Sequence, residues 1–411
     1  MKRALACLLF LLASARIAHA EDFFLKDGDT VVFYGDSITA QRLYTTHVEA
    51  FVAARYPERD IRFVHSGWGG DTVRGGMGGK IDRRLERDVI AWKPTVVTIM
   101  LGMNDASYRA LDEKIFAAYK KGYEQIVATL KEKLPAARLV LIEPSPFDDV
   151  TRKPTVPGGY NNVLLKYGEF VRELAKREGL PSVDLNAPVV ACLEKANDES
   201  AEVSQKILAD RVHPGPAGHL VMAKALLEAW HATPLVSDVT VDLDAAKVVK
   251  ADGADVSDVT SRSWTQADRA LPLAIDFRDP AVALAVRSSG LLDALEKHVV
   301  RVPGLAEGEY ELRMDETKIG VFKHDELAKG VSLSPHPTPA RQQALEVFMA
   351  ARKRGDVAED RWMRYVVKFE GKTSDNLTRV LDGLSALGDE LRADLRNVAK
   401  PKPHRFTLIA R

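Results

Sequence analysis

An α/β fold with a parallel central sheet, covered by helices on both faces, is predicted for residues 21–235. Strand-like and helix-like segments alternate throughout this stretch, which is typical of parallel β–α–β units. The segment 95–101 is apolar on both alternating faces, as a central parallel strand is. Glycine-rich or polar residues directly follow several predicted strands, and ligands bind at such strand ends in open α/β sheets.

The first predicted strand, 31–34, consists of consecutive apolar or aromatic residues rich in β-formers. Gly35-Asp36-Ser37 then turns the chain sharply into a helix-compatible stretch. A helix over 116–134 is predicted because its apolar and aromatic residues fall at helical spacing and would face the sheet. In chain order, the predicted strands are 31–34, 61–65, 95–101, 138–142 and 182–185, and the predicted helices are 41–55, 81–92, 116–134, 160–178 and 214–230.

Residues 236–411 are predicted to form a second, smaller module of mixed β/α structure without a chemical signature of its own. The segment 236–249 alternates apolar and polar residues, which predicts an edge or half-exposed strand. Prolines at alternate positions make 334–339 a rigid connector. The other predicted elements are a helix at 281–298, a small antiparallel set at 299–302, 310–314 and 318–322, amphipathic helices at 340–354 and 377–398, and a final strand at 405–409.

The composition is that of an ordinary globular protein with enough apolar residues for a sizeable core. Of 411 residues 46% are hydrophobic and 28% charged, and basic and acidic side chains balance at 58 each. The length favours two domains. Because there is no broad basic excess, nucleic acid is not an expected partner. The oligomeric state is left open.

Residues 1–20 are predicted to be a secretory signal peptide. They begin with Lys2 and Arg3, continue with an apolar run, and end in Ala18-His19-Ala20, a small-x-small cleavage site. A secreted or periplasmic protein cleaved after Ala20 is therefore expected, with no membrane anchor. Cys192 would then be the only cysteine, which excludes an intramolecular disulfide.

Ser37 is the first candidate for chemistry. A serine between a parallel strand and a helix faces the crevice at the sheet edge, and the N–H groups of the next turn point toward any negative charge there. The alternative interpretation is a helix cap, a position that serine often takes.

The second predicted strand leads into Gly67-Trp68-Gly69-Gly70, where glycines would let backbone N–H groups approach a ligand. A plain flexible turn is the alternative. The glycines and lysine at 75–80 superficially resemble a phosphate-binding loop but lack its spacing. After the third strand, Asn104 could donate an amide N–H into the same crevice, or form an Asx turn.

Asp210 and His213 lie three residues apart, just before a proline at a predicted helix start. Through a tight turn, the carboxylate could accept a hydrogen bond from His213 Nδ1 and leave Nε2 free for a nucleophile. A metal site formed with His219 is the rival interpretation, although no further ligand at suitable spacing completes it. Glu143, after the fourth strand, is interpreted as structural or peripheral.

These stretches together resemble the four sequence blocks of the SGNH, or GDSL-type, esterase and lipase family. Gly35-Asp36-Ser37, Gly70, 102–105 and 210–214 occur in the family's order, and the resemblance covers about residues 28–232. It implies a flavodoxin-like three-layer fold, with Ser37 as nucleophile, His213 as general base and Asp210 as its orienting partner. It also implies oxyanion donors from Ser37, Gly70 and Asn104, with Gly67 and Gly69 as neighbouring alternatives to Gly70. The stretches 310–315, 319–322 and 326–331 resemble the C-terminal companion module of exported bacterial members.

The function expected from these residues is hydrolysis of short-chain carboxylic esters, in particular O-acetyl groups on carbohydrate, without a metal or organic cofactor. Asp36, Trp68 and Tyr108 are candidate rim residues, and the two larger aromatics could stack on a sugar ring or simply pack. The alternatives are a lipid or aryl esterase, an acyltransferase with the same triad, or a protein that only binds glycans.

Overall fold

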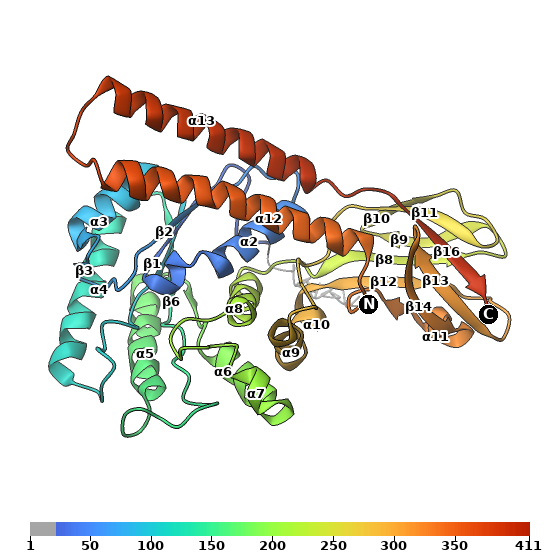
Figure 1. Ribbon diagram of the computed structural model, residues 1–411, viewed down its shortest axis with the longest axis horizontal. Coiled ribbons are helices and arrows are strands. Elements are labelled where there is room, and N and C mark those ends of the chain that lie inside the picture. Colours follow the sequence, from blue (N-terminus) through green and yellow to red (C-terminus); the bar gives the residue numbers. More distant parts are fainter. Residues whose placement is uncertain (1–21) are drawn as a thin grey trace, which may run out of the picture.

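The computed structural model describes residues 22–411, so the predicted signal peptide lies outside the described residues. A parallel five-stranded sheet in the order β2-β1-β5-β6-β7 forms the centre of the first part (Figure 1). This is the flavodoxin-like strand order, and it confirms the predicted fold class. The strands are β1 (Thr30–Gly35), β2 (Arg62–Gly67), β5 (Val96–Met100), β6 (Arg138–Ile142) and β7 (Ser182–Val183).

Helices cover both faces of this sheet. The helices α2 and α8 pack against each other on one side, and α3, α4 and α5 follow one another on the other side (Figure 1). The helices of this part are α1 (Ser37–Ala40), α2 (Leu43–Arg55), α3 (Ile81–Asp88), the 3₁₀ turn η1 (Ile90–Trp92), α4 (Glu113–Lys133), α5 (Tyr160–Glu178), α6 (Ala187–Glu199), α7 (Ala201–Ser204) and α8 (Pro216–Ala229).

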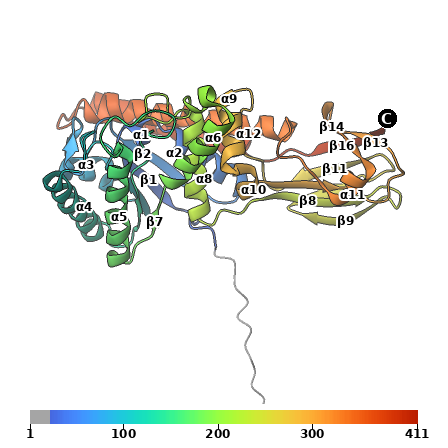
Figure 2. The ribbon, with the colours of Figure 1, turned by 90° about the horizontal axis from the view of Figure 1, so that it is seen from below.

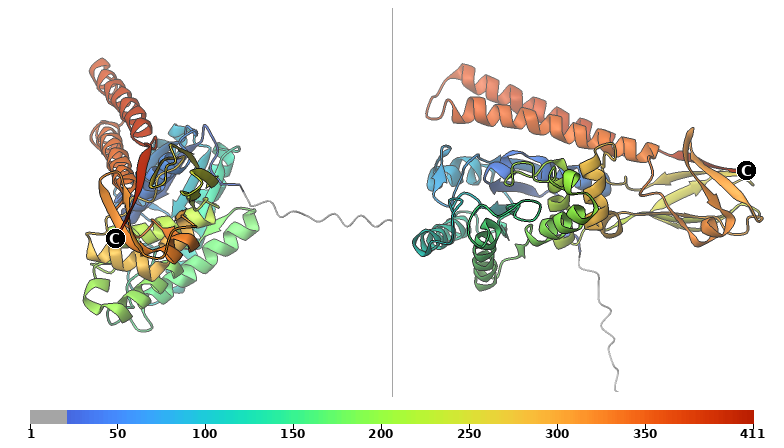
Figure 3. Two further views of the ribbon diagram at one scale, coloured as in Figure 1. Left: turned by 90° about the vertical axis from the view of Figure 1, so that its right-hand side faces the viewer. Right: turned by 60° about the horizontal axis from the view of Figure 1, so that its bottom comes forward.

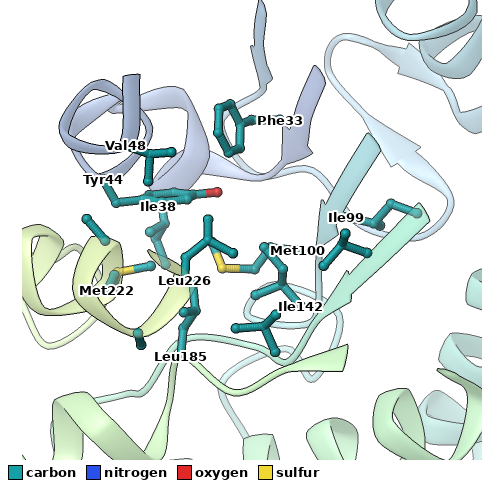
Figure 4. Close-up of a cluster of buried hydrophobic side chains, with 14 of the residues drawn as sticks. Phe33, Ile38, Tyr44, Val48, Ile99, Met100, Ile142, Leu185, Met222 and Leu226 are labelled. Carbon is teal, nitrogen blue, oxygen red and sulfur yellow. The ribbon is translucent and has the colours of Figure 1, made fainter. Parts of the chain in front are cut away.

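The core of this part lies directly beneath the first strand end. Phe33, Ile38 and Tyr44 from β1, α1 and α2 are fully buried. Ile38 and Tyr44 lie next to Met222 and Leu226 of α8, and Phe33 lies above the Tyr44 ring (Figure 4). Burying such side chains stabilises the fold by about 1.5–3 kcal/mol each. The turn that carries Ser37 therefore rests on fully buried side chains.

Most predicted elements of the first part are confirmed, and two of them, 138–142 and 160–178, have the predicted bounds. The predicted helix 41–55 is confirmed as α2, which begins at Leu43 because Arg42 adopts a left-handed conformation (φ 58°) that separates it from the short, unpredicted helix α1. The predicted helix 81–92 ends at Asp88 and continues as η1. Helices α6 and α7 were not predicted. The glycines at 75–80 form the short hairpin of β3 (Gly75–Gly76) and β4 (Gly79–Lys80).

Two further sheets lie at the end of the molecule opposite to α4 and α5 (Figure 2). One has the order β10-β11-β16-β13-β14, and the other β15-β12-β8-β9. Trp264 stacks on Phe406 in the core that these sheets share, with 5.0 Å between ring centroids. The strands are β8 (Leu235–Asp242), β9 (Lys247–Asp252), β10 (Ala254–Ser257), β11 (Ser263–Asp268), β12 (Lys297–Arg301), β13 (Glu309–Met314), β14 (Thr317–Lys323), β15 (Val331–Ser332) and β16 (His404–Ala410).

Three sequence predictions in this part are wrong. The segment 236–249 is not one edge strand, because the chain turns after Asp242 and β8 lies between β12 and β9. The predicted helix 281–298 is broken at Gly290, which has a φ of 62°, into α9 (Pro280–Ser289) and α10 (Leu291–Leu295), and its last residues enter β12. The β13–β14 pair is antiparallel as predicted, but β12 belongs to the other sheet and runs parallel to β8.

After β8 the chain returns twice to the first part. Helices α9 and α10 pack on α6 and α8. The long helix α12 (Pro339–Asp360) runs from the second part along α2, and α13 (Asp375–Val398) returns beside it (Figure 3). Between them, Arg361–Val367 forms a π-helical segment, η2. No helix among residues 22–411 is long and apolar enough to span a membrane. The division at 235/236 into two domains stays a prediction.

Candidate active site

Ser37 lies at the carboxyl end of β1 as the first residue of α1. Asp36 caps this helix, its side chain accepting a hydrogen bond from the Ile38 N–H (3.0 Å). The first N–H groups of a helix have no partner within the helix, so the N–H of Ser37 is available at the crevice. Gly67, at the end of β2, lets α1 approach closely, because a Cβ there would lie 2.1 Å from the backbone nitrogen of Ala40.

His213 reaches Ser37 from the loop before α8. His213 Nε2 lies 2.8 Å from Ser37 Oγ, and His213 Nδ1 lies 2.7 Å from Asp210 Oδ2. The other carboxylate oxygen, Oδ1, accepts hydrogen bonds from the N–H groups of Val212 (3.0 Å) and His213 (2.7 Å). This tight turn is the one predicted from the three-residue spacing, and it fixes the orientation of the imidazole.

Electrostatics favour an ionised Asp210. Partial burial would raise the pKa of its carboxyl, but the hydrogen bonds from the His213 N–H and ring and from the Val212 N–H bring the pKa below its usual range. Arg211 lies inside the turn with a φ of 74°, in the left-handed region that non-glycine residues seldom adopt. Its guanidinium donates to the carbonyls of Asp148 (3.3 Å) and Lys153 (2.8 Å), and these bonds hold the turn in place.

Asn104 enters the crevice from the end of β5, and its amide is held at both ends. Asn104 Nδ2 donates to the carbonyl of Asp71 (3.0 Å), and Asn104 Oδ1 accepts from Tyr108 Oη (3.1 Å). An amide nitrogen carries two hydrogens, so the second one is left for a ligand. Tyr108 is 44% exposed and stacks on Tyr160, with 5.1 Å between centroids, so it lies on the rim as predicted.

Gly70 lies in the loop that follows β2, the neighbour of β1 on the side opposite to β5. Its φ is 73°, which glycine adopts without strain, and Gly69 and Gly70 are both exposed. Because β2, β1 and β5 are adjacent, their carboxyl ends bring Gly70, Ser37 and Asn104 to one edge of the sheet. The chain order of these residues could not by itself show that adjacency.

Asp36 and Trp68 do not lie on an open rim. Asp36 is 1% exposed because its carboxyl turns inward to cap α1. Trp68 is half-buried, and its ring packs against the edge of Trp362 from η2, with 5.4 Å between centroids. Both residues support the site from beneath or beside it, so packing is the observed arrangement for Trp68.

The buried carboxyl of Asp36 makes stability depend on pH. Burial raises the pKa of Asp36 to about 7, against the hydrogen bond from the Ile38 N–H. Between pH 4 and 7 this carboxyl therefore holds a proton in the folded protein that it has lost in the unfolded chain, and its contribution to the free energy of unfolding falls as pH rises. Asp36→Asn keeps a capping acceptor and removes this titration. We expect its stability relative to the wild type to increase over that range, by at most about 1.4 kcal/mol per pH unit.

Urea unfolding at pH 4, 5.5 and 7 measures this difference, with the exposed Asp293→Asn as the matched control. Parallel stability curves for the wild type and Asp36→Asn would contradict the predicted pH dependence.

The predicted rival, a metal site with His219, is not formed. His219 is fully buried on α8, where its Nδ1 accepts from the Tyr44 N–H (3.2 Å) and its Nε2 bonds Gln41 Oε1 (2.9 Å). In the part of the chain that the structure describes, no group of three or more His, Cys, Asp or Glu residues could hold a metal ion. Glu143 is buried and pairs with Arg172 (3.0 Å), as its structural interpretation predicted.

Sequence reasoning missed the side chains that support the Gly70 loop. Arg84 of α3 is completely buried, and it donates to Asp71 Oδ2 (2.8 Å) and to the carbonyl of Ser66 (3.0 Å). It also pairs with Asp88. Trp362 lies almost 300 positions further along the chain. No local sequence signal connects these residues with the active site, because their contacts exist only in the folded protein.

Comparisons with known proteins identify a family. The model of the GDSL-like Lipase/Acylhydrolase family matches residues 33–221. An acetylxylan esterase from Geobacillus stearothermophilus is 30% identical over 224 residues, which are 49% of this chain and 94% of that protein. The chain therefore belongs to the GDSL-like lipase/acylhydrolase family. It is a carboxylic ester hydrolase with the SGNH fold.

Two solved structures are also similar. A gut microbial diltiazem-metabolizing enzyme matches with a TM-score of 0.81 and 25% identity, covering 94% of this chain and 98% of its own. The crystal structure of Axe2, an acetylxylan esterase from Geobacillus stearothermophilus, matches with a TM-score of 0.41 and 27% identity, covering 50% of this chain and 96% of its own. The first likeness extends through the C-terminal part.

Proposed function

We propose that Ser37, His213 and Asp210 are the catalytic triad of a serine esterase that removes short acyl groups, acetyl above all, through an acyl-Ser37 intermediate. The observation that carries this proposal is the unbroken hydrogen-bond chain from Ser37 Oγ through the His213 ring to Asp210 Oδ2. A nucleophile, a base and an orienting carboxylate in this geometry are the requirements for acyl transfer.

In the first step, Ser37 Oγ attacks the ester carbonyl carbon while His213 Nε2 takes the hydroxyl proton. The tetrahedral intermediate then collapses, and His213 returns that proton to the leaving alcohol oxygen. In the second step, His213 deprotonates a water molecule that attacks the acyl carbon, and Ser37 Oγ leaves with the proton. Asp210 stays ionised and stabilises the imidazolium.

Three donors would hold the oxyanion: the N–H groups of Ser37 and Gly70 and the second Nδ2 hydrogen of Asn104. They follow three adjacent strands, so they lie at the same edge of the sheet. Preorganised donors of this kind are worth about 2.7–4 kcal/mol of barrier each. Since Asp71 and Tyr108 already fix the amide of Asn104, that donor is oriented before substrate binds.

The substrate class we propose is an O-acetylated carbohydrate. The acetylxylan esterase relative supports the acetyl group and a sugar alcohol. The exposed ring of Tyr108, next to Asn104, offers an aromatic face on which a sugar could stack. We also propose that residues 1–20 direct export, which would place the enzyme where polysaccharides are found.

A second candidate is an esterase that acts on a small organic ester. It is favoured by the gut microbial diltiazem-metabolizing enzyme, whose structure resembles this chain over almost its whole length. The same triad would serve both substrate classes. Which class the enzyme prefers therefore depends on the leaving alcohol that the crevice accommodates.

Three parallel assays of residues 21–411 test the proposal: acetate release from acetylated xylo-oligosaccharides, consumption of diltiazem, and hydrolysis of p-nitrophenyl octanoate. We expect the highest kcat/KM on the acetylated oligosaccharides, and only a trace of that turnover with Ser37→Ala. A preference for diltiazem would favour the second candidate, and a preference for octanoate a lipid esterase. Absence of turnover on all three, with tight binding of the acetylated oligosaccharide by both proteins, would indicate a glycan-binding protein instead.

A further inference from the structure

The hairpin of α12, η2 and α13 lies outside the segment that matches the family model, yet it reaches the active-site loop. Helix α12 runs along α2, and the end of the hairpin that carries η2 comes next to α3 (Figures 1 and 3). The π-helical segment η2 has the wide turn that recurs at functional sites. Trp362, the second residue of η2, is 8% exposed and reaches Asp88 at the end of α3.

Trp362 is connected to one end of the Gly70 loop through two buried side chains. Trp362 Nε1 donates to Asp88 Oδ1 (2.6 Å), and Arg84 pairs with Asp88. Arg84 Nε in turn donates to Asp71 Oδ2 (2.8 Å). Arg84 and Asp88 are both 0% exposed, so the connection is shielded from water. Hydrogen bonds between buried charged groups are strong and hold their partners in place.

Trp362 also contacts the other end of the loop. Its ring meets Trp68 edge to face, at an interplanar angle of 88°. The Arg84 guanidinium lies over both rings, 5.4 Å from the centroid of Trp68 and 5.7 Å from that of Trp362. Gly78 makes room for Trp68, because a Cβ there would come within 2.6 Å of its ring. The half-buried Trp68 is therefore held by packing against Trp362, Arg84 and Gly78.

Trp68 and Asp71 bracket Gly69 and Gly70. Two successive exposed glycines have more conformational freedom than any other pair of residues, so this loop needs external anchors to keep one geometry. Asp71 has a second role, since its carbonyl accepts the hydrogen bond that orients Asn104. A shift of Asp71 would thus move two of the three proposed oxyanion donors.

We propose that Trp362 is a positioning residue for the oxyanion hole, so that the C-terminal hairpin is part of the catalytic apparatus without touching the substrate. This inference rests on the proposed function, because it assigns Gly70 and Asn104 to the oxyanion. Ion pairs from Glu370 to Arg83 (2.5 Å) and Arg87 (2.8 Å), on either side of Arg84, close the hairpin over α3. Misplacing a catalytic group by about 1 Å can lower a rate about 100-fold.

The test uses the full mature chain with Trp362→Ala and Trp362→Phe on p-nitrophenyl acetate. We expect Trp362→Ala to lower kcat about 10- to 100-fold, with KM within about threefold of the wild type. Trp362→Phe keeps a ring against Trp68 but loses the donor to Asp88, so its kcat should lie in between. The pH profile of kcat should keep its shape, because Ser37, His213 and Asp210 are not touched.

Leu395→Ala is the matched control. Leu395 is buried in α13 within the second core, a cluster of buried side chains that includes no residue of the Gly70 loop among those the structure describes. It should lower the melting temperature, as a core cavity does, while kcat stays within about twofold of the wild type. An equal fall in kcat for Leu395→Ala and Trp362→Ala would show that general destabilisation is responsible, and would overturn the proposal.

Indole added to Trp362→Ala provides a second readout. It can fill the vacated space and supply both the ring and the N–H donor, so we expect kcat to recover several-fold. Benzothiophene has a similar shape without the N–H and should restore less. If kcat is unchanged in Trp362→Ala, the positioning role is refuted, whereas the proposed function is unaffected. Wild-type protein without activity on esters, or Ser37→Ala with full activity, would refute the proposed function instead.

Discussion

Ser37→Ala is expected to lower kcat/KM for p-nitrophenyl acetate by a factor of about 10⁴ to 10⁶, as in other serine hydrolases that lose the nucleophile. The substitution removes only the hydroxyl that lies 2.8 Å from His213 Nε2. The residual activity would come from the donors of the oxyanion hole and from binding. Stopped-flow measurement of nitrophenolate release also reports the acyl-enzyme burst, which should vanish in the variant.

The double variant Ser37→Ala, His213→Ala provides the control for this prediction. Residues of a triad act as a unit, so the double variant should be no less active than Ser37→Ala alone. Unfolding curves of both variants should match that of the wild type, because the hydroxyl and the ring are partly exposed. A Ser37→Ala protein that retains a tenth of the wild-type rate would contradict the assignment of the nucleophile.

Arg354→Met is expected to lower the free energy of unfolding by about 3–5 kcal/mol, the usual effect of removing one partner of a buried ion pair. Arg354 of α12 donates from Nε and a terminal nitrogen to the two carboxylate oxygens of Glu49 on α2, at 2.6 and 2.7 Å. It also donates to the carbonyl of Phe63 in β2 (3.2 Å). Burial alone would raise the pKa of Glu49, but Arg354 and the bond from His65 bring it below its usual value.

Urea unfolding measures the loss, and the double variant Glu49→Leu, Arg354→Met separates its causes. An apolar pair leaves no uncompensated charge, so the double variant should be more stable than Arg354→Met. Lys166→Ala, which breaks the exposed pair with Glu169, should change stability by less than about 1 kcal/mol. A double variant as unstable as Arg354→Met would indicate that the contact with Phe63, not the carboxylate, is decisive.

The predicted fold is confirmed mainly where one segment carries its own signal. Strand β6 and helix α5 have the predicted bounds, since an apolar run and a 3.6-residue period are local properties. The errors fall where tertiary contacts override local preference. Gly290 ends α9 within a helical pattern, and β12 pairs in parallel with β8, a partner distant in the sequence.

The candidate site follows the same division. Ser37, Gly70, Asn104, Asp210 and His213 could be selected from the sequence because each directly follows a strand or lies in a short turn with characteristic spacing. Asp36 was misplaced on the rim, and the choice between stacking and packing stayed open for Trp68, because sequence does not show in which direction a side chain points. Arg84 and Trp362 could not be found at all, since neither lies in a motif.

By itself, then, the sequence determined the α/β class, the family and the residues that are candidates for catalysis. Periodicity and short motifs depend only on neighbours along the chain. Only the tertiary structure decided that β2, β1 and β5 are adjacent, that His213 reaches Ser37, and that Trp362 packs on Trp68. Strand order is set by the burial of side chains from distant elements. The same burial brings Trp68 and Trp362 together, although almost 300 residues separate them along the chain. That burial depends on the whole chain and is not visible in any single stretch of it.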